Sequence, residues 1–129
     1  MRFGPHTAIL AAVLSLAAAP ALASICQGKS MTLEENVDAI NASHGCERAM
    51  KVFRDCAYTA SGDIRLGAAV EKKCERDFLG HLGTAEKRAY QRELRVCDHK
   101  YDNESGTMYR SFTAFCRAEV AQRYSRRAR

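Results

Sequence analysis

Six cysteines constrain the fold of this 129-residue chain more than any other feature. They are Cys26, Cys46, Cys56, Cys74, Cys97 and Cys116. An even number of cysteines in a short chain is typical of a disulfide framework, provided that the chain reaches an oxidising compartment. A zinc site is the alternative, but no CxxC or HxxxH spacing supports it. We therefore predict disulfides, and no metal or cofactor.

The N-terminus has the pattern of a secretory signal peptide. Arg2 precedes an apolar run from Ala8 to Ala18, and Ala21-Leu22-Ala23 then supplies the small side chains of a cleavage site. The run is too short to cross a bilayer, which takes about 20 residues. We predict a signal peptide over residues 1–23, cleavage near Ala23, and a periplasmic or secreted domain over 24–129. Removal of Arg2 lowers the formal charge from +5 to +4.

The rest of the chain favours helices, because it has no proline after Pro20 and apolar side chains recur at helical spacing. The apolar stripes are Leu33, Val37 and Ile40; Cys46, Ala49, Met50, Phe53, Cys56 and Ala57; Leu66, Val70, Cys74 and Phe78; Tyr90, Leu94, Cys97 and Tyr101; and Tyr109, Phe112, Cys116 and Val120. Thr32 and Glu35 form a capping box, the Ser61-Gly62-Asp63 turn offers an N-cap to the helix that follows, and Thr84 is an expected N-cap. We predict one all-α domain, a small disulfide-stapled array of four or five antiparallel helices with a basic C-terminal tail.

The positions of the cysteines along the predicted helices limit which of them can pair. Cys46 and Cys74 lie at nearly equal distances before and after the Ser61-Gly62 turn. Cys97 and Cys116 lie in the same way on the two sides of the Gly106-Thr107 joint. Two antiparallel helices joined by such a turn place the members of each pair side by side. This favours Cys46–Cys74 and Cys97–Cys116 and leaves Cys26–Cys56. The rival set of Cys46–Cys56 with Cys26–Cys74 needs a kink, because an unbroken helix holds residues 46 and 56 about 15 Å apart.

Catalytic motifs are missing from the sequence, and we predict that the protein is not an enzyme. There is no GxSxG, HExxH or SxxK, and His44, His81 and His99 are well separated. Most carboxylates alternate with basic residues, as expected of solvated helix faces.

The C-terminus is the exception to this charge mixing. Arg123, Arg126, Arg127 and Arg129 have no acid near them in the sequence. They predict either an exposed helix end or a contact for an acidic partner such as an anionic envelope surface. Nucleic acid is not expected in the predicted compartment, and the arginines carry no platform of aromatic side chains on which bases could stack.

The second half of the chain resembles the LprI-type lysozyme inhibitor family over about residues 46–124. The resemblance rests on Cys56 followed by the Asp63 to Val70 stretch, on Cys97 at a helix end, on the Gly106-Thr107 loop, and on Cys116 followed by Arg123. Cys46 stands where the family often has its first cysteine. Gly67 and Val70 replace the Asn and Tyr of the family pattern, and Cys26 and Cys74 are additional.

The resemblance implies a small periplasmic helical domain that binds and inhibits a lysozyme, and it implies the same Cys97–Cys116 bond. The loop formed by Asp102, Asn103, Glu104, Ser105, Gly106 and Thr107 is the expected contact with the enzyme. The alternative is an envelope protein that binds another acidic partner without inhibiting lysozyme, because a +4 protein is repelled by basic lysozymes during encounter.

Overall fold

The computed structural model describes residue 26 and residues 31–129, and this part of the chain is helical, with no strand. The predicted signal peptide and its cleavage site at Ala23 lie outside the described residues. The elements are α1 (Leu33–Asn41), α2 (Gly45–Cys56), α3 (Asp63–Phe78), the short 3-10 helix η1 (Leu79–His81), α4 (Thr84–His99) and α5 (Thr107–Arg127). The predicted all-α array is confirmed. None of the helices among the described residues is both long enough and apolar enough to cross a membrane.

The helix starts follow local sequence signals, with one exception. The capping box before α1 is present, since Glu35 N donates to Thr32 and Thr32 N donates to the Glu35 carboxylate. The N-cap of α4 is Gly83 rather than Thr84, and the Glu86 carboxylate accepts the Gly83 N–H at 2.9 Å. The N-cap of α3 is Gly62, because the carboxylate of Asp63 turns back to the preceding loop. The predicted N-cap Thr84 was therefore wrong by one residue, whereas the N-cap of α3 lies within the predicted Ser61-Gly62-Asp63 turn.

The three disulfides are those that the helical register favours. Cys26 pairs with Cys56, Cys46 with Cys74, and Cys97 with Cys116, at Cα–Cα distances of 5.4, 4.5 and 5.6 Å. Residues 46 and 56 lie on one unbroken helix, α2, so the rival pairing is excluded. Three disulfides indicate an oxidising compartment.

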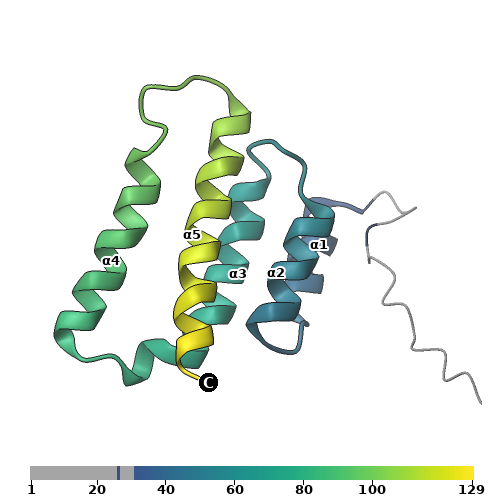
Figure 1. The fold of residues 1–129 in the computed structure, drawn as a ribbon. Helices are drawn as coiled ribbons and strands as arrows, with labels where there is room; N and C mark the ends of the chain where they lie inside the picture. Colours follow the sequence, from purple (N-terminus) through teal and green to yellow (C-terminus); the bar gives the residue numbers. More distant parts are fainter. Residues whose placement is uncertain (1–25, 27–30) are drawn as a thin grey trace, which may run out of the picture.

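Helices α3 and α5 pack against each other at the centre, with α4 on one side and α2 and α1 on the other (Figure 1). Gly67 permits their close approach, because a Cβ built there would lie 2.9 Å from both the Cβ and the backbone oxygen of Ala114. Helix α4 packs on α5 and meets α3 where Tyr90 contacts Phe78 edge to face.

The buried face of α5 differs from the predicted stripe. Of Tyr109, Phe112, Cys116 and Val120, only Val120 is fully buried. The helix instead buries small and polar side chains against its neighbours, namely Ser111, Ala114, Ala118, Ala121, Gln122 and Ser125. Small side chains let two helix backbones come close together, and hydrophobic periodicity does not detect them.

Candidate functional site

The tip of the α4–α5 hairpin displays the predicted contact loop. Asp102 to Thr107 are all exposed, and α5 begins at Thr107, directly after Gly106 with its φ of +114°. Backbone bonds from Asp102 N to His99 O and from Glu104 N to Tyr101 O hold the turn. His99 Nδ1 also lies 2.7 Å from the Asp102 carboxylate. The loop therefore has a defined shape and full access to solvent.

Aromatic side chains lie directly below this loop. Tyr101, Tyr109 and Phe112 form a cluster with ring centroids 5.7 to 5.9 Å apart. Phe112 is 37% exposed and the neighbouring Met108 is 43% exposed. Exposed aromatic and methionine side chains of this kind are typical of protein contact surfaces. We call the loop together with these four side chains the hairpin tip.

The Cys97–Cys116 disulfide fixes the two helices that carry the hairpin tip. Cys97 is fully buried in the core, four residues before Tyr101, and Cys116 lies four residues after Phe112. A crosslink at this position restricts how the two helix ends move relative to each other. The disulfide thus restrains the two helices from which the hairpin tip extends.

The C-terminal arginines are exposed, but they contact side chains of other helices and of α5 itself. Arg126 makes two bonds to the Glu47 carboxylate, at 2.5 and 2.9 Å, and Arg129 makes a third at 3.0 Å. Arg123 pairs with Glu93 at 2.9 Å, and Arg127 lies over the ring of Tyr124. The hydrogen bonds from Arg126 lower the pKa of Glu47 to about 2. The acids that neutralise this end come from α2 and α4.

The end of α5 is also packed rather than merely exposed. Tyr124 contacts the rings of Phe78 and Tyr90, and its hydroxyl donates to Glu93. Ser125 is buried and its hydroxyl donates to Asp77. Residues 124–129 thus belong to the folded domain.

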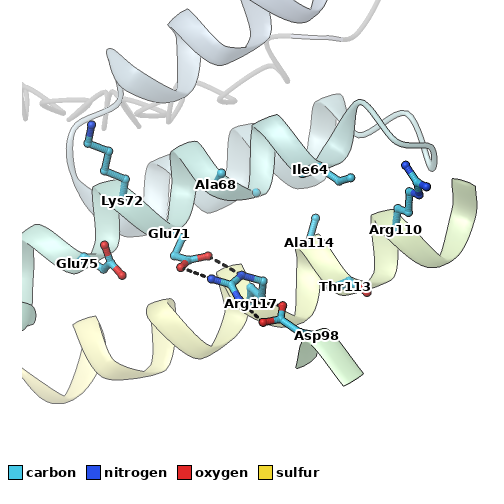
Figure 2. A pocket seen from close by; sticks show the side chains of 11 residues that line it. Ile64, Ala68, Glu71, Lys72, Glu75, Asp98, Arg110, Thr113, Ala114 and Arg117 are labelled. Atoms are coloured by element: carbon cyan, nitrogen blue, oxygen red, sulfur yellow. Dashed lines mark hydrogen bonds and ion pairs between the residues drawn. The ribbon is translucent and has the colours of Figure 1, made fainter. Parts of the chain in front are cut away.

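A groove of about 640 Å³ runs between α3 and α4 over α5 (Figure 2). Gly67, Ala68 and Ala114 give it an apolar floor. Arg117 crosses the groove and donates to Glu71 at 2.8 and 3.0 Å. The same guanidinium donates to both oxygens of Asp98, each at 2.8 Å. These bonds engage the Arg117 guanidinium on both sides and connect α3, α4 and α5. Most of its N–H groups are therefore already bonded to carboxylates of the protein.

One carboxylate in the groove has an altered acidity. Burial raises the pKa of Glu75, which accepts a hydrogen bond from the Tyr90 hydroxyl at 2.9 Å. Burial also raises the pKa of Tyr90. No group of three or more His, Cys, Asp or Glu side chains in the described part of the chain could hold a metal ion.

The sequence analysis did not single out the Arg117 network, although one signal for it was present. Asp98 and Arg117 each follow a cysteine, so the Cys97–Cys116 bond by itself brings an acid and a base together. Nothing in the sequence pointed to Glu71, which lies 46 residues away from Arg117.

The predicted contact residues are divided between two places. The loop from Asp102 to Thr107 remains open at the hairpin tip, and the arginines of α5 lie at the opposite end of that helix, engaged with side chains of α2, α4 and α5. Comparison with protein-family models, with curated proteins and with solved structures found no match to this chain.

Proposed function

We propose that the protein is an exported, non-enzymatic binding protein of the inhibitor type, and that it contacts a partner protein through the hairpin tip. One observation carries the proposal: an exposed, well-defined loop stands on a partly exposed aromatic cluster whose base is crosslinked by Cys97–Cys116. Rigid loops backed by aromatic side chains supply contact area at low entropic cost. The disulfides and the predicted signal peptide support a periplasmic or secreted location.

The resemblance to LprI-type inhibitors makes a lysozyme the first target. Asp102 and Glu104 give the loop a local negative charge that suits a basic enzyme. Phe112 and Met108 supply the apolar anchors. The overall charge of +4 on residues 24–129 repels a basic lysozyme as the two proteins approach each other. Binding therefore depends on the acidic loop and the apolar anchors together.

The test is a lysozyme activity assay on peptidoglycan with the purified, oxidised protein. We expect inhibition by the unaltered protein and a loss of potency of about 30-fold on Phe112→Ala, the effect of removing one aromatic anchor. Ile64→Ala is the matched control, because Ile64 on α3 is 45% exposed but outside the hairpin tip, and it should leave inhibition unchanged.

Two outcomes contradict the proposal. Absence of inhibition excludes the lysozyme target and favours the alternative, an envelope protein that binds another acidic partner. Equal weakening by Phe112→Ala and Ile64→Ala excludes the hairpin tip as the contact.

A further inference from the structure

We propose that the outward face of α4 docks on a bilayer of anionic phospholipids. This surface adjoins the hairpin tip at Lys100, whose Nζ lies 5.4 Å from the centroid of the Tyr101 ring, but the proposal does not depend on lysozyme inhibition. It consists of Arg88, Arg92, Arg95 and Lys100, which we call the α4 basic face, with Val96 among them.

Helical register places these cations on one side of α4. Residues 88, 92 and 95 follow the i, i+4, i+7 spacing of a single helix face, and residues 96 and 100 border it on one side. The buried residues of α4, namely Tyr90, Leu94 and Cys97, lie on the opposite side and pack on the core. All four cations are exposed.

No ion pair engages the four cations of this face within the part of the chain that the structure describes, and the acid at its C-terminal end, Asp102, contacts His99 at 2.7 Å. Helix α4 has three carboxylates, and each is engaged elsewhere: Glu86 caps the helix start, Glu93 pairs with Arg123, and Asp98 pairs with Arg117. None of the four cations forms an ion pair among residue 26 and residues 31–129. The fold therefore turns Glu93 and Asp98 of α4 toward α5 and leaves the four cations facing outward.

The shape and composition of this face suit a lipid surface. From residue 88 to residue 100 the face extends for about 18 Å along a straight helix, so its charges can reach one plane together. Val96 is 67% exposed, the highest value among the large apolar side chains that are exposed in the described residues. An apolar side chain among arginines is typical of helices that lie in the headgroup region, where the arginine stems are also accommodated. The α4 basic face has no aromatic ring on which nucleic-acid bases could stack.

The experiment is cosedimentation of the exported, oxidised protein with vesicles of phosphatidylglycerol and phosphatidylcholine, against vesicles of phosphatidylcholine alone. We expect binding to the anionic vesicles only, and its loss when salt is raised to about 1 M, where screening shortens to about 3 Å. The double reversal Arg92→Glu, Arg95→Glu should weaken binding by at least about 25-fold, because each basic residue near such a surface contributes about fivefold.

The control is the double reversal Arg48→Glu, Arg76→Glu, which makes the same change in net charge on α2 and α3 at residues without ion pairs among those described. It should retain most of the vesicle binding, and the conservative pair Arg92→Lys, Arg95→Lys should retain nearly all of it. Equal loss in both reversals would show that only net charge matters and would overturn the proposal. Binding to duplex DNA without binding to anionic vesicles, or equal binding to both kinds of vesicle, would overturn it as well.

Discussion

At the scale of single residues, the most consequential side chain is the fully buried carboxylate of Asp63. It accepts the backbone N–H of Tyr58 at 2.8 Å and of Thr59 at 2.9 Å. The hydroxyl of Ser111 on α5 donates to the same carboxylate at 2.6 Å. Thr59 has a φ of +56°, which is unfavourable for a β-branched residue, and the bond to Asp63 helps to hold it there. One side chain therefore fixes the α2–α3 loop and joins it to α5.

Replacing Asp63 should show the cost of leaving these donors unsatisfied. We expect Asp63→Ala to lower the free energy of unfolding by about 2–4 kcal/mol, because two partly buried N–H groups and the buried Ser111 hydroxyl lose their acceptor. Ser111→Ala removes only one bond and should cost about 1 kcal/mol. Urea denaturation with the disulfides intact measures both values. If both variants lose the same small amount of stability, water has replaced the Asp63 carboxylate as the hydrogen-bond acceptor.

At the scale of elements, the contact between α3 and α5 depends on side-chain size more than on hydrophobicity. Gly67 on α3 faces Ala114 on α5, and most other buried side chains of α5 are alanine or serine. The aromatic side chains of α5 lie beside this contact, with Phe115 stacked on Phe53 of α2 and Tyr124 against Tyr90 of α4.

Adding one methyl group at this contact should separate the two helices. We expect Gly67→Ala to reduce stability by about 1–3 kcal/mol, since the new Cβ meets the backbone of α5 and not a movable side chain. Gly80→Ala is the matched control, because nothing lies within 4 Å of a Cβ at Gly80. The measurement is the melting temperature of the Gly67→Ala and Gly80→Ala variants. An equal shift in both variants would contradict close packing at Gly67.

The end of α5 is attached to the start of α2 by an ion pair whose strength depends on pH. The pKa of Glu47 is about 2 in the folded protein, below its ordinary value of 4.5, because Arg126 donates to it. A carboxyl group with a lowered folded pKa contributes stability above its unfolded pKa and loses that contribution as the pH falls. The pair should therefore stabilise the fold at neutral pH and weaken between about pH 4.5 and pH 2.

Glu47→Gln should remove this part of the pH dependence. The Glu47 side chain is 40% exposed, so solvent screening limits the expected loss to below about 1 kcal/mol at pH 7. The measurement is the free energy of unfolding at pH 7 and pH 3 for both proteins. The difference between the proteins should shrink at pH 3, and an unchanged difference would show that the charge of Glu47 is not responsible.

At the scale of the whole molecule, the disulfides divide the chain into two crosslinked parts. Cys26–Cys56 and Cys46–Cys74 tie the residues up to α3, and Cys97–Cys116 ties α4 to α5. No disulfide joins the two parts. They are held together by the α3–α5 packing and by polar pairs between the parts, such as Glu71–Arg117 and Glu47–Arg126.

Export and oxidation make a prediction about the complete chain. Mass spectrometry of the exported protein should find Ser24 at the N-terminus and no cysteine open to alkylation before reduction. After reduction, all six cysteines should react, which controls for access of the reagent. A retained Met1 or a free thiol on the exported protein would contradict the predicted compartment.

The sequence by itself determined the helices, their approximate positions and the cysteine pairing that the structure has. These depend on local rules, because residues three or four apart share a helix face and short turns bring neighbouring helices level. The exposed loop between α4 and α5 could be predicted for the same reason, since its residues are consecutive. Only the tertiary structure decided the partners of Asp63, Glu71 and Arg126, which lie 48, 46 and 79 residues from the side chains they bind. It also decided which side chains α5 buries, because the close approach of two helix backbones leaves no periodic pattern in the sequence of one helix. It decided as well that the basic side chains of α4 face outward, because the acids of α4 pair with residues of another helix that the sequence of α4 alone does not reveal.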